Sequence, residues 1–260
     1  MLSKNKKINY EIHGSGKPLV LLNGIMMNTL SWVEHVKILE KYFTVITYDM
    51  RDQGMSLHEE KKYDISIHVN DLNELIGELN LKKINLLGLS YGGMVSQLFT
   101  LKFPEKVDKL ILSNTVDYVD NYLKVLGQLW IQAAKLYDGE KFFDIALPII
   151  YSRNFYNNNY DWLMSRRKIF KDYLNKDWYD GFIRLAESNK EFDVRNKIET
   201  IKSDTLILAG DEDIITPLNI MKNMNKKIKN STLKVFNETG HGMFLEKMNE
   251  YLNICIKFIK

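Results

Sequence analysis

The chain of 260 residues has a single cysteine, Cys255, which excludes an internal disulfide and any metal site built from several cysteines. Cys255 lies in an apolar stretch, which favours a buried thiol that fills space. No stretch approaches the roughly 18 consecutive apolar residues that a membrane-spanning helix needs. The lysines near the beginning of the chain are not followed by the apolar run of a secretory signal. We therefore expect a reduced, soluble, cytoplasmic protein without a membrane span.

An excess of charge of one sign is also lacking, because 36 Lys and Arg residues stand against 33 Asp and Glu residues, a net charge of +3. The charges are spread evenly along the chain, which argues against a nucleic-acid partner. Apolar residues make up 45% of the chain and charged residues 27%, proportions that are typical of a globular protein. These proportions exclude a chain that is mainly disordered, collagen-like or coiled coil.

The first half of the chain alternates short apolar runs with amphipathic segments of helical periodicity. Strands are predicted over residues 8–13, 19–22, 43–48, 84–87 and 107–112, and helices over 31–41, 64–80 and 90–103. The alternation resumes late in the chain, with strands over 205–209 and 233–236 and helices from residue 217 and from about residue 244. This pattern predicts an α/β fold with a mostly parallel central sheet and helices on both faces.

The alternation is interrupted over residues 117–197, which have no clear strand pattern and are rich in aromatic side chains. Three of the four tryptophans, Trp130, Trp162 and Trp178, lie in this segment. We therefore predict a core formed by residues 1–116 and 198–260, with residues 117–197 inserted as a helical cap.

The sequence Gly88-Leu89-Ser90-Tyr91-Gly92 has the pattern G-x-S-x-G and lies between a predicted strand and a predicted helix. In that context the serine occupies a tight, strained turn that exposes its hydroxyl above the sheet. The small residues on either side allow the strand and the helix to approach each other closely. The motif therefore predicts that Ser90 is a nucleophile.

A serine hydroxyl is a weak nucleophile and needs a general base beside it. His241 lies in a glycine-flanked loop, residues 238–242, directly after the last predicted strand. The carboxyl ends of parallel strands meet at one edge of a sheet, so Ser90 and His241 are expected to lie close together. The other histidines are interpreted as exposed or packing residues: His13, His35, His58 and His68.

The base in turn needs a carboxylate, and the loop Gly210-Asp211-Glu212-Asp213 follows the predicted strand 205–209. By position alone, any of the three acids in this loop could be the carboxylate that pairs with His241. Asp213 lies deepest in the loop, and Asp117, after the strand 107–112, is the alternative.

Five segments together resemble the α/β-hydrolase fold family over essentially the full length of the chain: YEIHGSGKPLVLLNG, YDMRDQGMS, LLGLSYGGM, LILAGDEDIITP and ETGHGMFLE. The order nucleophile, acid, base along the chain is also that of the family. The resemblance implies that Ser90 is the nucleophile, Asp213 the acid and His241 the base. It also implies a helical cap over residues 117–197, and neither a metal nor a cofactor is expected.

An oxyanion hole needs two backbone N–H groups that point at the developing negative charge. One is expected from Tyr91, the residue after the nucleophile, and the resemblance assigns the other to Ile25. The chain departs from most relatives by having Asn23-Gly24 where they have His-Gly. Because the donors belong to the backbone, the hole is expected to survive this change.

Several apolar side chains fall beside the predicted site loops and indicate an apolar acyl or alkyl pocket. They are Met26, Met27, Met94 and Phe244, with Trp130 contributed by the helical segment. Arg51, in the loop after the strand 43–48, is interpreted as structural.

These features predict a hydrolase of a small, largely apolar ester, thioester or lactone, acting through an acyl-enzyme on Ser90. An acyltransferase or a carbon–carbon bond hydrolase would use the same three residues. An alternative function outside catalysis is that of a non-enzymatic relative of this family that binds a small ligand in its pocket. In each case the expected partner is a small molecule.

Overall fold

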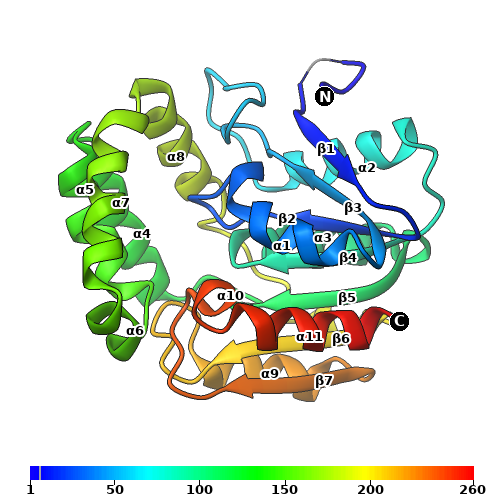
Figure 1. The fold of residues 1–260 in the computed structure, drawn as a ribbon. Coiled ribbons are helices and arrows are strands. Elements are labelled where there is room, and N and C mark those ends of the chain that lie inside the picture. Colours follow the sequence, from blue (N-terminus) through cyan, green and yellow to red (C-terminus); the bar gives the residue numbers. More distant parts are fainter. Residues whose placement is uncertain (6) are drawn as a thin grey trace.

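The computed structural model describes residues 1–5 and 7–260, and within them the strands form one seven-stranded sheet (Figure 1). The sheet order is β1-β3-β2-β4-β5-β6-β7, with β1 antiparallel to β3 and every other pair parallel. The strands are β1 (Tyr10–His13), β2 (Lys17–Leu22), β3 (Phe43–Tyr48), β4 (Ile84–Leu89), β5 (Val107–Ser113), β6 (Asp204–Gly210) and β7 (Ser231–Phe236). The mostly parallel α/β fold predicted from the alternation is therefore confirmed.

The sequence placed the beginning of the first strand two residues too early. Ile8 and Asn9 lie outside β1, and Asn9 forms an isolated bridge with Leu2. The backbone N–H of Ser3 donates to the Ile8 carbonyl, so this part of the chain pairs with the N-terminal residues. An apolar side chain at Ile8 marks burial in the core here, not membership of the strand.

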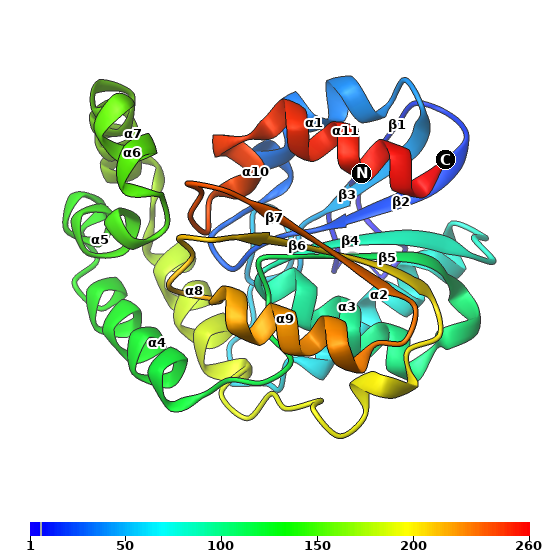
Figure 2. The same cartoon turned by 90° about the horizontal axis from the view of Figure 1, so that it is seen from below.

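Helices cover both faces of the sheet, as Figure 2 shows in the edge-on view. One face carries α2 (Ser66–Glu78), α3 (Tyr91–Lys102) and α9 (Leu218–Lys227), and the other carries α1 (Val33–Leu39), α10 (Met243–Glu246) and α11 (Met248–Ile259). Side chains alternate between two buried clusters along each central strand. In β4, Leu86 packs toward α2 and α3, whereas Leu87 packs toward α1 and α11. Burial on both faces explains why these strands are continuous apolar runs.

The segment predicted as the cap folds into five α-helices and one short 3-10 helix (Leu147–Ile149) within the described residues, and the α-helices lie together beside the carboxyl ends of the parallel strands (Figure 1). They are α4 (Asn121–Ala134), α5 (Gly139–Ala146), α6 (Arg153–Asn158), α7 (Tyr160–Tyr173) and α8 (Lys176–Ser188). Their aromatic residues form a third apolar cluster, in which Phe142 and Phe143 are fully buried. None of the described helices is long and apolar enough to cross a membrane.

The two ends of this helical segment meet at one point. An isolated antiparallel bridge joins Tyr118 to Asp193. Next to it, the backbone N–H of Val119 donates to the Phe192 carbonyl, and that of Val194 donates to the Asp117 carbonyl. The chain therefore leaves the sheet after β5 and returns beside the same position before β6.

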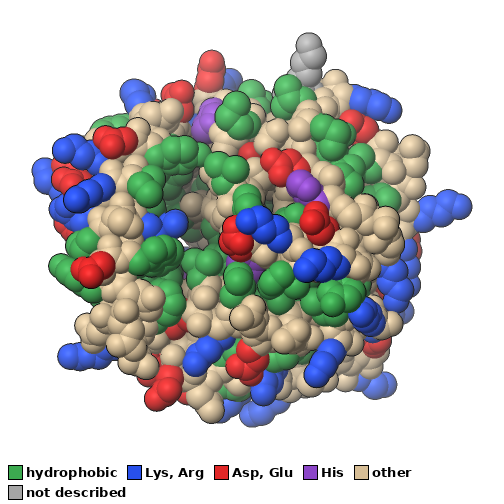
Figure 3. All heavy atoms as spheres, in the orientation of Figure 1, with side chains coloured by type: hydrophobic (Ala, Val, Ile, Leu, Met, Phe, Trp, Pro, Cys, Tyr) green, Lys and Arg blue, Asp and Glu red, His purple; other side chains and the backbone are tan. Residues whose placement is uncertain are grey.

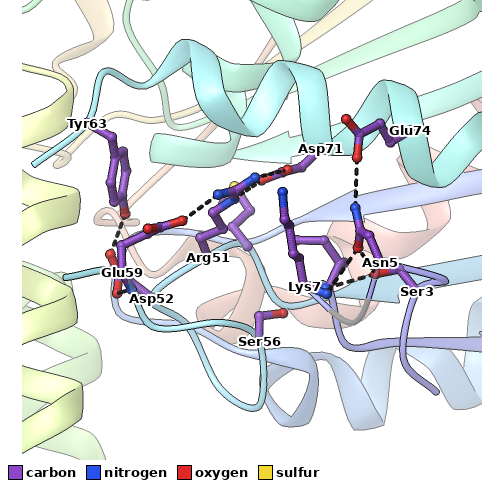
Figure 4. A network of polar contacts seen from close by, with 12 residues as sticks. Ser3, Asn5, Lys7, Arg51, Asp52, Ser56, Glu59, Tyr63, Asp71 and Glu74 are labelled. Carbon is purple, nitrogen blue, oxygen red and sulfur yellow. Dashed lines mark hydrogen bonds and ion pairs between the residues drawn. The ribbon is translucent and has the colours of Figure 1, made fainter. Parts of the chain in front are cut away.

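A polar network holds the loop after β3 in place (Figure 4). The Arg51 guanidinium donates to both oxygens of Asp71 on α2, at 2.6 Å each, and also contacts Glu59. Asp52 accepts hydrogen bonds from the Tyr63 hydroxyl at 2.7 Å and from Arg184 of α8 at 2.6 and 3.0 Å. The structural interpretation of Arg51 agrees with these contacts, and Arg184 ties the helical segment to the loop.

Replacing Arg184 by Leu is expected to lower the free energy of unfolding by about 2–4 kcal/mol, because the buried Asp52 carboxylate loses the guanidinium and keeps the hydrogen bonds from the Tyr63 hydroxyl and the Glu59 N–H. Urea unfolding followed by circular dichroism measures the change. Arg195→Leu is the matched control, since Arg195 pairs with Asp193 on the surface and its loss is expected to cost far less. Equal losses for the two variants would contradict a buried ion pair that ties α8 to the loop.

Candidate active site

Ser90 occupies the sharp turn between β4 and α3. Its backbone has φ 54° and ψ −114°, a conformation that residues other than glycine rarely adopt. The turn is held by the Ser90 N–H, which donates to the Ser113 carbonyl at 2.9 Å, and by the Thr115 hydroxyl, which donates to the Ser90 carbonyl at 2.8 Å. Contacts to the neighbouring strand β5 and to the loop after it therefore stabilise the strained residue.

The glycines of the G-x-S-x-G pattern are required by close contacts at this turn. A Cβ atom on Gly92 would lie 2.4 Å from the Leu22 carbonyl oxygen, and one on Gly88 would lie 2.3 Å from the Ser96 hydroxyl. Any larger residue at Gly92 would push α3 away from the end of β2. The glycines of the motif thus permit the close contact between α3 and the sheet that was predicted from the sequence.

Ser90, His241 and Asp213 come together at the carboxyl ends of the strands. The Ser90 Oγ lies 2.9 Å from the His241 Nε2, and the His241 Nδ1 lies 2.8 Å from an Asp213 carboxylate oxygen. The carboxylate beside Nδ1 favours the proton on that nitrogen, which leaves Nε2 to accept the hydrogen of the serine hydroxyl. Asp117, the alternative acid, instead forms an ion pair with Lys227 at 3.1 Å.

Asp213 is buried and has several hydrogen-bond donors besides His241. Its carboxylate accepts from the backbone N–H groups of Ile215 and Thr216, from the Thr216 hydroxyl at 2.6 Å and from the Asn114 amide at 2.9 Å. Burial opposes ionisation, but the charge interaction and hydrogen bond with His241 and the bonds from Thr216 outweigh it and lower the pKa of Asp213. The carboxylate is therefore held ionised.

Asn114 and Thr216 were missed by the sequence analysis. The Asn114 amide also donates to the carbonyls of Gly240 and His241, at 3.1 and 3.2 Å, so one side chain fixes both the acid and the loop of the base. A weak signal was present for each residue, because Asn114 directly follows an apolar strand and Thr216 follows Asp213 by three positions. Neither signal reveals which loop the side chain contacts.

Ile25 and Tyr91 are the residues whose backbone N–H groups are predicted to stabilise an oxyanion. Both residues line a small hollow together with Ser90, and Ile25 also lines the larger cavity. Among the described residues, no protein atom accepts a hydrogen bond from either N–H. Both N–H groups thus lack a partner in the described part of the protein, and their role as an oxyanion hole stays a prediction.

The side chain of Asn23 organises the loop that carries Ile25. Its amide oxygen accepts from the Trp32 indole N–H at 2.7 Å, and its amide nitrogen donates to the Tyr48 carbonyl at 3.0 Å and to the Gln53 side chain at 3.1 Å. Gln53 donates in turn to the Gly24 carbonyl at 2.9 Å. Asn23 is fully buried, and its neutral amide acts as both donor and acceptor. Most members of the family that the chain resembles have histidine at this position.

A cavity of about 590 Å³ opens next to Ser90 and His241, and Figure 3 shows a hollow rimmed by hydrophobic side chains. Of the residues predicted for the pocket, Met26, Met27, Phe244 and Trp130 line it. Met94 instead lines the smaller hollow of about 50 Å³, where Trp130 and Ser90 also lie. Further walls come from the helical segment, through Ile169, Phe170 and Trp178.

No cluster of three or more His, Cys, Asp or Glu side chains suited to a metal ion occurs in the described part of the chain. The arrangement therefore offers a serine, an imidazole, an ionised carboxylate and two backbone donors as its chemical groups. Together they suit nucleophilic attack on a carbonyl group.

Comparison with known proteins places the chain among hydrolases. It is 25% identical to a 2-hydroxy-6-oxo-2,4-heptadienoate hydrolase of Pseudomonas putida, over 95% of this chain and 90% of the relative. The structure of MGS-M2, an alpha/beta hydrolase enzyme from a Medee basin deep-sea metagenome library, is 32% identical with a TM-score of 0.94, covering 97% of this chain and 94% of that chain.

A third similar protein is the esterase EaEST of Exiguobacterium antarcticum, 27% identical with a TM-score of 0.83, covering 97% of this chain and 95% of that chain. The sequence model of the alpha/beta hydrolase fold matches residues 17–248. The chain therefore belongs to the alpha/beta hydrolase fold family.

Proposed function

We propose that this protein is a serine hydrolase that cleaves a small ester, thioester or lactone through an acyl-enzyme on Ser90. The observation that supports it most is the pair of hydrogen bonds, 2.9 Å from Ser90 to His241 and 2.8 Å from His241 to Asp213. This chain of contacts ends in a carboxylate that is held ionised. The similarity to an esterase over 97% of the chain points in the same direction.

In the first half of the reaction, His241 takes the hydroxyl proton while the Ser90 oxygen attacks the substrate carbonyl. The carbonyl oxygen gains the negative charge, and the N–H groups of Ile25 and Tyr91 stabilise it. Collapse of the intermediate breaks the bond to the leaving group, which receives the proton from His241. Asp213 stabilises the imidazolium while it exists.

In the second half, a water molecule gives a proton to His241 and attacks the acyl-enzyme. The resulting intermediate expels Ser90, which recovers its proton from His241. The helical segment 117–197 acts as a cap in this proposal, because Ile169, Phe170 and Trp178 cover the cavity beside the serine. Apolar walls exclude water and bind the hydrocarbon part of the substrate.

Hydrolysis of a carbon–carbon bond is the second candidate, favoured by the similarity to a 2-hydroxy-6-oxo-2,4-heptadienoate hydrolase over nearly the full length of both chains. The same serine, histidine and carboxylate would serve this reaction. The two candidates differ in the leaving group, which is an oxygen or sulfur atom in the first and a carbon atom in the second. Turnover of p-nitrophenyl esters of C2 to C16 acids, compared with turnover of 2-hydroxy-6-oxo-2,4-heptadienoate, separates them.

Ser90→Ala is expected to abolish ester hydrolysis and to leave the melting temperature nearly unchanged, because it removes only one oxygen atom. A fluorophosphonate probe is expected to add its mass to the peptide that contains Ser90 in the wild type and not in the variant. Hydrolysis near the wild-type rate by a clean preparation of the variant would exclude the proposed nucleophile. Failure of the wild type to react with the probe would favour a protein that only binds its ligand.

Asp213→Asn is expected to lower kcat by orders of magnitude, about 10⁴-fold in the best-studied serine hydrolases, because an amide does not stabilise the imidazolium and favours the wrong tautomer. Asp117→Asn is the control, since that carboxylate contacts Lys227 and not His241. Steady-state kinetics on a p-nitrophenyl ester measure both. A larger loss in Asp117→Asn than in Asp213→Asn would move the acid to the loop after β5.

Asn23→Leu is expected to lower kcat at least tenfold with a much smaller change in KM, because the Ile25 N–H loses its alignment with the developing oxyanion. Asn85→Leu is a matched control, since Asn85 is equally buried and donates to the Pro18 carbonyl at the other end of β4. Both variants lose stability, but only the first is expected to lose kcat in the folded enzyme. Equal kcat values in the two variants would show that Asn23 has a structural role alone.

A further inference from the structure

The lining of the large cavity is mainly apolar, and its charged residues include Arg166 on α7. Among the described residues that line the cavity, Glu34 is the only acid, and it forms an ion pair with Lys37 at 2.6 Å. Within the described residues, Arg166 has no carboxylate within 4.0 Å and no hydrogen-bond acceptor among the protein atoms. Its neighbour Arg167, in contrast, pairs with both Glu140 and Asp144 at 2.7 Å.

Aromatic side chains accompany Arg166 in the wall of the cavity. Arg166 is half-buried, and its guanidinium lies over the Trp162 ring at 4.9 Å from the ring centre. Burial raises the pKa of the Tyr151 phenol to about 12; the positive charge of Arg166 opposes this rise, and the negative charge of Glu246 adds to it. Trp162 and Tyr151 both line the same cavity.

Tyr151 connects the Arg166 side of the cavity with the loop of His241. A Cβ atom on Gly242, the residue after His241, would lie 2.7 Å from the Tyr151 ring. The acid nearest this contact, Glu246, accepts hydrogen bonds from the backbone N–H groups of Ser152 and Gly240. One oxygen of Glu246 is therefore held by backbone N–H groups, whereas its other oxygen is buried and has no hydrogen-bond partner among the described residues. Neither oxygen lies within 4.0 Å of the Arg166 guanidinium, and Arg166, Tyr151 and His241 all line the same cavity.

We propose that Arg166 binds a carboxylate carried by the substrate, at the opposite end of an apolar chain or ring from the carbonyl that Ser90 attacks. This inference rests on the proposed hydrolase function and narrows its substrate class from largely apolar esters to esters with one acidic tail. A cation in an apolar wall without a counter-ion is costly, and a planar guanidinium binds a carboxylate through two parallel hydrogen bonds. The substrate would thus supply the anion that the protein lacks at this place.

The test compares charged and neutral substrates of similar length. For an acidic acyl part, 4-nitrophenyl hydrogen adipate is compared with 4-nitrophenyl heptanoate, and for an acidic alcohol part, 4-(hexanoyloxy)benzoate is compared with phenyl hexanoate. The wild type is expected to prefer the charged member of at least one pair in kcat/KM. Arg166→Met is expected to reduce that preference by roughly 10- to 100-fold, mainly through KM, and Arg166→Lys to restore part of it.

Arg167→Met is the matched control, because Arg167 is adjacent in sequence but paired with acids of α5, and its preference is expected to equal that of the wild type. The proposal is overturned if the wild type prefers the neutral member of both pairs, or if Arg166→Met and Arg167→Met change the preference equally.

Binding measured without turnover separates this proposal from the hydrolase function. Monomethyl adipate is titrated into Ser90→Ala and followed by tryptophan fluorescence, with dimethyl adipate as the neutral comparison. Tighter binding of the monoester that is lost in Ser90→Ala/Arg166→Met supports the acidic-tail site even if the wild type hydrolyses no ester. Equal binding of the two compounds overturns it even if neutral esters are hydrolysed.

Discussion

The turn between β4 and α3 requires α3 to begin almost in contact with the end of β2, because Gly92 faces the Leu22 carbonyl oxygen with no room for a side chain. Gly93 is equally confined, since a Cβ atom there would lie 2.6 Å from the Thr115 side chain after β5. The helix is therefore wedged between the ends of the two strands that flank β4. Residues that follow these strands, Asn23 and Asn114, reach the site because of this crowding.

Neutral amides hold the loops that this crowding brings together. Asn23 and Gln53 fix the chain after β2 through carbonyl and amide contacts, and Asn114 fixes the loops of Asp213 and His241. An amide donates and accepts at once, so it can satisfy buried backbone carbonyls without adding a charge next to the reacting groups. The electrostatics near Ser90 are thereby left to Asp213, His241 and the backbone donors.

Features set by local geometry could be predicted from the sequence. The alternation of apolar runs and amphipathic segments indicates the parallel sheet, and the glycines around Ser90 mark a turn that only small residues permit. The choice of Asp213 among three neighbouring acids came from family resemblance, because position in the loop does not reveal which carboxylate faces the imidazole. The wrong first boundary at Ile8 shows that an apolar residue can be buried next to a strand without pairing in it.

Contacts between distant parts of the chain could not be predicted in the same way. Asn114 meets His241 and Asp52 meets Arg184 across more than a hundred residues, so no local pattern records the pairing. Met94 was expected in one pocket with Met26, but α3 directs it into the smaller hollow beside Ser90. The sequence likewise does not reveal that Arg167 has acidic partners while its neighbour Arg166 has none within 4.0 Å among the described residues.

The bridge between Tyr118 and Asp193 closes the helical segment into a loop whose two ends leave the sheet side by side. The residues between Tyr118 and Asp193 therefore form a single insertion at one position of the sheet. The pairing register of β5 and β6 does not depend on the length or sequence of this insertion. Substitution, insertion or exchange of whole helices in this segment can therefore change the cavity walls that it supplies without moving Ser90. The condition is that the ion pair between Asp52 and Arg184 is kept or replaced. The insertion supplies part of the cavity wall, whereas Ser90, Asp213 and His241 all belong to the rest of the chain.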